Sequence, residues 1–195
     1  MKIEPQSLSR SDAYFLFTKL VVPRPIALLL TESPTGVLNV APFSYFNMVS
    51  IEPAVAMVSI QRTAKGMKDS SRNLLANQKA VIHIVDAAIL DDMHATSKAL
   101  GPDESELLLT SFTTTPQPGH LPYIEQAKAH FNVTLHQHIE VGHNDLMLLK
   151  IEEVVLQERA LQDGDVRLDF DNIVGRFGSK HYVVGGTVVE KERMG

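Results

Sequence analysis

The segment at residues 68–73, which reads KDSSRN, gathers residue types that bind anions where a loop enters an expected helix. It holds two cations, two hydroxyls and an amide. The first turn of a helix has free backbone N–H groups, and such groups together with cations suit a phosphate. An ordinary helix start has the same pattern, because Asp69 or Ser70 can cap the helix while the charges face solvent. The segment therefore predicts either a phosphate site or a capped helix.

Arg24 lies between Pro23 and Pro25 in the stretch VVPRPIALL. Proline fixes the local backbone and removes an N–H donor, so Arg24 is expected on a stiff support. A stiffly held guanidinium suits recognition of a phosphate or a carboxylate. An exposed arginine at the start of a strand is the plainer alternative.

The segment at residues 39–47, NVAPFSYFN, mixes three aromatic rings with polar side chains around a central proline. A core strand has no need of the amides or of the proline. Pro42 is expected to interrupt the strand ladder and to leave nearby backbone amides for a ligand. The segment therefore predicts one wall of a binding site.

Other chemistries find less support in the sequence. His136 and His138 are two residues apart on an expected strand, with His143 nearby, but no third zinc ligand with sensible geometry is evident, so no metal site is predicted. Ser44 lies outside any G-x-S-x-G motif, which argues against a serine hydrolase. The chain has no cysteine, which excludes disulfides, thiolate metal sites and a cysteine nucleophile.

The elements that position these residues are mainly strands. Apolar runs and alternating patterns predict strands at residues 25–33, 37–43, 54–62, 80–86, 130–141 and 145–158, and the closing stretch 176–186 follows a DGD hairpin turn at 163–165. Asn132 is expected on the exposed face of its strand. Short helices are predicted within 66–78 and at 89–100, after the third and fourth strands, and 101–122 reads as an irregular excursion. This order favours a mostly antiparallel barrel over a doubly wound sheet.

The composition indicates one domain over residues 1–195. The net charge is −5 and no basic run occurs, so a nucleic-acid partner is not expected. No apolar run reaches the ~20 residues of a membrane span, and the first residues lack the apolar core of a signal peptide. These observations predict a soluble cytoplasmic protein.

Three blocks resemble the flavin reductase-like, FMN-binding split-barrel family, including its flavoredoxin-like members. They are PRPIA at 23–27, NVAPFSYFN at 39–47, and KDS at 68–70 with Asn73 soon after, where Ser70 replaces the usual threonine. The resemblance is strong over 14–86 and thins later, although GRFGSKHY at 175–182 is similar to a late family segment with Ser179 in place of a glycine.

The resemblance implies a mostly β, split Greek-key barrel with short inserted helices. It also implies a homodimer with non-covalent FMN near the interface, reduced by NADH or NADPH and passing electrons to free flavin, an electron carrier or a small substrate. The cofactor-binding residues carried over from the motifs are Arg24, Asn39, Ala41, Pro42, Phe43, Ser44, Tyr45, Lys68, Asp69, Ser70, Asn73 and His181.

Roles within this set follow from what FMN needs. Lys68, Ser70 and Arg24 are expected at the phosphate, and the backbone of 41–46 at the edge of the flavin ring. His181 and Tyr182 are candidates for the substrate side or an ordinary strand-edge pair. No catalytic acid or base is assigned, and the chain has no G-x-G-x-x-G motif for a nicotinamide cofactor.

Two alternatives remain beside the enzyme. A protein of this fold could bind flavin or haem without turnover, or it could be a structural homodimer without a cofactor.

Overall fold

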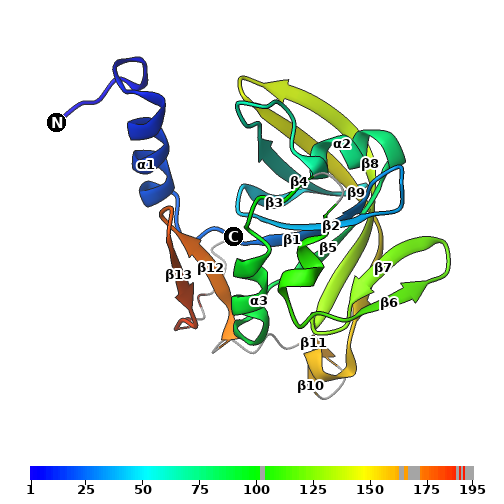
Figure 1. Cartoon of the computed structure of the whole chain (residues 1–195). Coiled ribbons are helices and arrows are strands. Elements are labelled where there is room, and N and C mark those ends of the chain that lie inside the picture. The colour runs from blue at the N-terminus through cyan, green and yellow to red at the C-terminus, as the bar shows by residue number, and fades with distance from the viewer. Residues whose placement is uncertain (102–103, 163–164, 167–171, 188, 190, 192–195) are drawn as a thin grey trace.

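A curled antiparallel sheet of seven strands forms the body of the protein (Figure 1). The computed structural model describes residues 1–101, 104–162, 165–166, 172–187, 189 and 191. In spatial order the strands are β2 (Leu38–Phe43), β1 (Ala27–Glu32), β5 (Lys79–Ile84), β8 (Ala129–Val141), β9 (Asn144–Leu156), β4 (Ala54–Gln61) and β3 (Phe46–Ile51).

The sheet closes because its two edge strands are neighbours in the sequence. Only Ser44 and Tyr45 separate the end of β2 from the start of β3, although these strands lie at opposite edges of the sheet. The sheet must therefore curl until its edges meet at this corner, as in a barrel. The bend between β2 and β3 is thus a fixed point of the fold.

Apolar side chains fill both faces of β1, as its continuous apolar run predicts. Leu29 packs into the interior of the barrel with Phe43, Phe46 and Leu149. Leu28 packs into a second cluster outside the barrel, beneath α3 (Leu90–Ala95) and the hairpin of β6 (Thr114–Gln117) and β7 (His120–Ile124). These two clusters hold β1 and the motif residues that follow it.

Helices and small hairpins surround the barrel. The helices are α1 (Arg10–Leu20), α2 (Asp69–Asn77), α3 (Leu90–Ala95) and the short 3-10 segments Pro5–Ser7, Ala87–Ile89, Glu106–Leu109 and Glu158–Ala160. The hairpins are β6 (Thr114–Gln117) with β7 (His120–Ile124), β10 (Leu161–Gln162) with β11 (Asp165–Val166), and β12 (Val174–Phe177) with β13 (His181–Val184). No helix in the described part of the chain is both long and apolar enough to span a membrane.

The strands predicted from apolar runs are confirmed within a few residues. The predicted DGD turn has its first two residues outside the described ranges, while β10 and β11 pair on either side of it. The helix expected at 89–100 ends at Ala95, and it follows the fifth strand rather than the fourth because β3 was not predicted. The stretch 101–122 is more regular than expected, because it contains β6 and the start of β7.

Two finer predictions were wrong. Asn132 lies on the face of β8 opposite the interior cluster, as the alternation predicts, but it is only 1% exposed. The β6–β7 hairpin covers that face, and the Asn132 amide donates to Gln117 Oε1 and to Glu153 Oε2. Neither Asp69 nor Ser70 occupies the N-cap of α2: Lys68 holds that position, without a side-chain capping bond.

Candidate functional site

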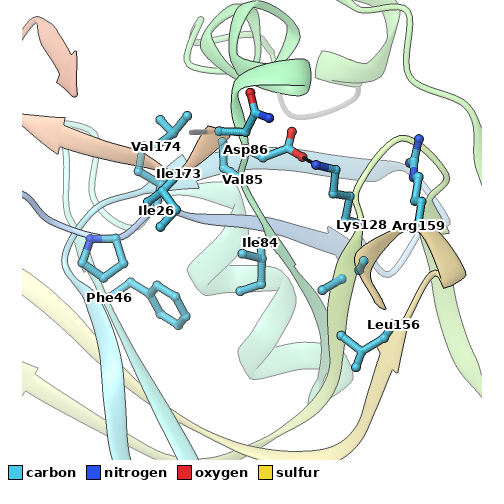
Figure 2. Close-up of a pocket in the computed structure, with 14 residues that line it drawn as sticks. Ile26, Phe46, Ile84, Val85, Asp86, Lys128, Leu156, Arg159, Ile173 and Val174 are labelled. Atoms are coloured by element: carbon cyan, nitrogen blue, oxygen red, sulfur yellow. Dashed lines mark ion pairs between the residues drawn. The ribbon is translucent and has the colours of Figure 1, made fainter. Parts of the chain in front are cut away.

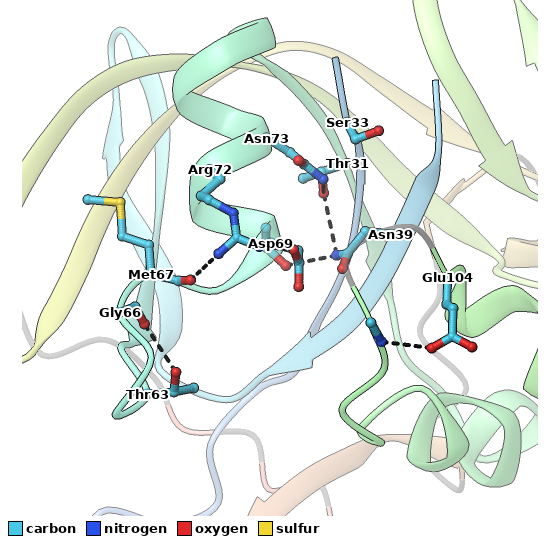
Figure 3. A network of polar contacts seen from close by, with 12 residues as sticks. Thr31, Ser33, Asn39, Thr63, Gly66, Met67, Asp69, Arg72, Asn73 and Glu104 are labelled. Atoms are coloured by element: carbon cyan, nitrogen blue, oxygen red, sulfur yellow. Dashed lines mark hydrogen bonds and ion pairs between the residues drawn. The ribbon is translucent and has the colours of Figure 1, made fainter. Parts of the chain in front are cut away.

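Asn39, Ser70 and Asn73, which the motifs predict together, meet in one buried cluster around Thr31 (Figure 3). The Asn39 amide donates to Ser70 Oγ at 2.9 Å and to Thr31 Oγ1 at 3.4 Å. The Asn73 amide donates to the same Thr31 oxygen at 3.2 Å. The cluster bonds α2 to β1 and β2, so these side chains fix the start of α2 rather than open into a cavity.

Lys68, immediately before α2, borders a groove that is rich in cations. Its ammonium lies 5.5 Å from the centre of the Phe43 ring, and desolvation lowers the pKa of this ammonium. Asp69 pairs with Arg72 and is not among the residues that line the groove. The groove has a volume of about 620 Å³ and is lined by Arg10, Ser11, Tyr14, Phe15, Gln61, Arg62, Thr63 and Lys68. We call it the cationic groove.

Arg62 is held in the cationic groove by acidic partners on the β8–β9 hairpin. Its guanidinium lies 2.6 Å from Asp145 Oδ1 and 2.7 Å from Glu140 Oε1. Burial alone would raise the pKa of Asp145, but hydrogen bonds from Arg62 and His138 lower it, so the carboxylate stays charged. His138, Glu140 and Asp145 are ligand types that could hold a metal, yet Arg62 already bonds two of them. The arrangement positions an arginine.

The bend at Ser44 and Tyr45 opens beside an apolar cleft. Pro42 does not interrupt β2 as expected: the strand continues through Pro42 to Phe43, which an edge strand tolerates, and the bend follows. Phe43 and Phe46 are core residues, and Ala41 packs against the same interior cluster. Of the motif's rings, only Tyr45 is exposed.

The apolar cleft lies between the end of α1 and the strands β3, β4 and β9. Its volume is about 650 Å³, and it is lined by Phe17, Val21, Pro23, Arg24, Pro25, Ser44, Tyr45, Phe46, Asn47, Met57, Ser59, Val141, Asn144 and Leu146. A cleft of this size and apolar character suits a flat aromatic ligand.

Arg24 is 6% exposed, and its guanidinium is engaged by backbone carbonyls. One nitrogen donates to Thr18 O and Val21 O, both at 2.7 Å, and another donates to Gly178 O at 2.9 Å. Its Nε donates to Ser44 Oγ at 3.4 Å. Arg24 therefore joins the C-terminal end of α1, the β12–β13 turn and the Ser44 bend.

A smaller polar pocket of about 160 Å³ adjoins Ser44. Arg176 and Tyr182 line it together with Tyr14 and Ser97. The Arg176 guanidinium lies 4.5 Å above the Tyr182 ring, and the Tyr182 hydroxyl is 2.9 Å from His94 Nδ1. We call this the polar pocket.

His181 lies beside Tyr182 on β13, opposite Phe177, and is exposed. Tyr182, not His181, borders the polar pocket.

The three hollows share walls. Tyr14 borders both the cationic groove and the polar pocket, while Ser44 borders both the polar pocket and the apolar cleft. Sequence reasoning did not find Arg10, Arg62 or Thr63. Arg62 is the last residue of the strand predicted at 54–62 and Thr63 follows it, a few residues before KDS, which was the available signal. The combination suits a ligand with an anionic end and a flat apolar end.

Comparisons with known proteins agree with this chemistry. A family model described as "Flavin reductase like domain" matches residues 19–171. The uncharacterized protein YwrF of Bacillus subtilis (strain 168) is 34% identical over 188 residues, covering 92% of each chain. The crystal structure of nitrilotriacetate monooxygenase component B from Bacillus cereus has 29% identity and a TM-score of 0.92, covering 98% of each chain.

A structure described as a flavin reductase with a split barrel domain, from Shewanella frigidimarina NCIMB 400, has a TM-score of 0.83. The match covers 97% of this chain and 96% of the Shewanella chain, at 19% sequence identity. Likeness at that identity concerns the fold, and it confirms the predicted split barrel.

Proposed function

Because this chain belongs to the flavin reductase-like domain family, we propose that it is an FMN-binding oxidoreductase that uses NADH or NADPH as electron donor. The observation that carries the proposal is the row of three hollows: the cationic groove meets the polar pocket at Tyr14, and the polar pocket meets the apolar cleft at Ser44. FMN has a dianionic phosphate and a flat aromatic ring, and the two hollows offer the matching chemistry.

The phosphate end of the ligand is assigned to Lys68, Arg62 and Thr63. Lys68 brings a partly desolvated ammonium, and desolvation strengthens its attraction to an anion. Arg62 is held in place by Asp145 and Glu140, so its geometry is set before a ligand arrives. Arg10 adds a third cation from α1. Ser70 supports this end indirectly, by fixing α2.

The ring end is assigned to the apolar cleft and the backbone of residues 41–46. Bound there, FMN would supply the redox chemistry that links a reduced nicotinamide as hydride donor to free flavin, an electron carrier or a small organic substrate as acceptor. Hydride transfer needs no side-chain acid, so the chain's part is to bind, orient and shield. Ser44 offers a hydroxyl to the ring, and Arg176 and Tyr182 offer polar contacts to a substrate.

We also propose that two copies of the chain associate, as a homodimer in the cytoplasm. The support is exposed apolar surface beside the cleft: Phe17 and Leu20 on α1, and Met48, Val49 and Ile51 on β3. Ile51 is 85% exposed, and a protein surface that gathers several large exposed apolar side chains is typical of an interaction surface.

Titration with FMN and with riboflavin, which lacks the phosphate, tests the assignment. Lys68→Gln should weaken FMN binding by about ten- to hundredfold, the range for a lost charge-assisted contact. Riboflavin affinity should stay unchanged, and Lys65→Gln, an exposed lysine outside the groove, should change neither. Unchanged FMN binding in Lys68→Gln would place the phosphate elsewhere.

A visible spectrum under anaerobic conditions tests the reaction. Bleaching of a flavin band by NADH or NADPH is expected. A flavin band that neither donor bleaches points to the non-catalytic alternative, and a Soret band points to haem.

A further inference from the structure

A second cavity adjoins the apolar cleft and has no role in the proposed flavin site (Figure 2). Pro25 and Phe46 line both hollows. The second cavity has a volume of about 220 Å³, and its apolar walls come from distant parts of the chain: Ile26, Phe46, Ile84, Val85, Leu156 and Val174. An engineered apolar cavity of ~150 Å³ binds benzene, so this one has room for a single ring with a substituent.

Charged side chains gather at one wall of this cavity. Lys128 and Asp86 form an ion pair at 3.0 Å, so their charges compensate each other. Figure 2 shows Arg159 on the same side as Lys128. The Arg159 guanidinium donates to the carbonyls of Glu125 and Gln126 at 3.1 and 2.9 Å.

The carbonyl partners of Arg159 orient its guanidinium without neutralising it. Among the residues whose side chains the structure describes, no carboxylate forms an ion pair with Arg159. A guanidinium that carbonyl groups hold in place beside an apolar cavity is complementary to a carboxylate carried on an apolar body.

We propose that this cavity binds a single-ring aromatic carboxylate, with the ring against Ile84 and Leu156 and the carboxylate at Arg159. The ring gains burial among apolar side chains, and the carboxylate keeps a charged partner at the rim, where desolvation costs least. The inference does not rest on the flavin proposal, since Ile84, Leu156 and Arg159, the residues assigned to the aromatic carboxylate, line none of the cationic groove, the polar pocket and the apolar cleft.

Fluorine NMR with 4-fluorobenzoate as probe tests the proposal on the full chain. 4-Fluorobenzoate is expected to bind, and the neutral analogue 4-fluorobenzyl alcohol is expected to bind about tenfold more weakly, or more weakly still. Arg159→Gln should weaken the binding of 4-fluorobenzoate by a similar factor. Arg159→Lys, which keeps the charge, should retain most of the affinity for 4-fluorobenzoate. Ala129→Leu should abolish binding, because it adds bulk to the cavity wall. Ala160→Leu, on the same cavity, serves if Ala129→Leu fails to fold.

Three outcomes would overturn the inference: equal affinity for the alcohol, full binding by a folded cavity-filling variant, or competition between the probe and FMN. The last would place the probe in the flavin cleft. FMN affinity of Ala129→Leu is measured in parallel and should match the wild-type value, so failure here is separable from failure of the flavin assignment.

Discussion

Replacing His83 should change how the stability of the protein depends on pH. The imidazole is fully buried where β5 meets β1 and β7. Its Nε2 accepts from the Ile124 N–H at 2.9 Å, so the neutral ring carries its proton on Nδ1 and donates to Leu28 O at 3.1 Å. Both bonds are satisfied only by the neutral ring, and desolvation is the main cause that lowers the pKa of His83 to about 3.

The size of the effect follows from this pKa. An unperturbed histidine has a pKa of about 6.5, so between pH 6.5 and 3 this histidine is protonated in the unfolded chain but stays neutral in the folded chain. The folded state therefore loses stability as pH falls through this window, by about 1.4 kcal/mol per pH unit. As pH falls from 6.5 to 3, His83 lowers the free energy of unfolding by on the order of 4.8 kcal/mol, of which about 2.7 kcal/mol is lost by pH 4.5.

Urea unfolding of wild type and His83→Gln across this pH range measures the effect. Glutamine is neutral and keeps an acceptor for Ile124, but it loses the bond to Leu28, so at neutral pH the variant should be about 1–3 kcal/mol less stable. The difference should shrink by about 2.7 kcal/mol near pH 4.5 and can change sign. His136→Gln, an exposed histidine on β8, is the control and should follow the wild-type curve. Parallel curves for wild type and His83→Gln would refute the reasoning.

Two further changes test how the motif residues are held. A Cβ on Gly175 would lie 2.7 Å from Pro23 Cβ, so Gly175→Ala should cost about 1–3 kcal/mol in thermal unfolding, whereas Gly186→Ala, whose Cβ meets nothing within 4 Å, should cost far less. Arg24→Met removes the donors that join α1 to the β12–β13 turn, so amide hydrogen exchange in α1 should speed up by about tenfold or more. Lys19→Met is the control and should leave exchange in α1 unchanged. Unchanged exchange in Arg24→Met would mean that these hydrogen bonds do not hold the helix.

Much of the barrel could be predicted because most of its strands have continuous or alternating apolar residues in the sequence. β3 escaped prediction because four of its six residues are exposed, so its pattern lacks the alternation of a half-buried strand. The burial of Asn132 was missed because the β6–β7 hairpin covers its face of β8, and the alternation within one strand does not show what packs on that face.

The sequence predicted which residues gather at the site better than it predicted how those residues are bonded. The motifs predict Asn39, Ser70 and Asn73 together, and Asn39 does bond Ser70. The link from Asn39 to Asn73 runs through Thr31, which no motif includes. Arg62 was missed for a related reason. Its partner Asp145 lies 83 residues further along the chain, so only the folded sheet shows that Arg62 is fixed in the groove.

Arg24 shows why a motif residue need not be a ligand contact. Its stiff support was expected from the flanking prolines, and the residue is indeed buried and tightly bonded. Its guanidinium donates to carbonyls at the end of α1, and α1 carries Arg10 and Tyr14 to the cationic groove. A change at Arg24 would therefore reach an anionic ligand through the position of α1. Direct contact of Arg24 with a phosphate stays a prediction, and it requires the guanidinium to give up carbonyl bonds that the fold already uses.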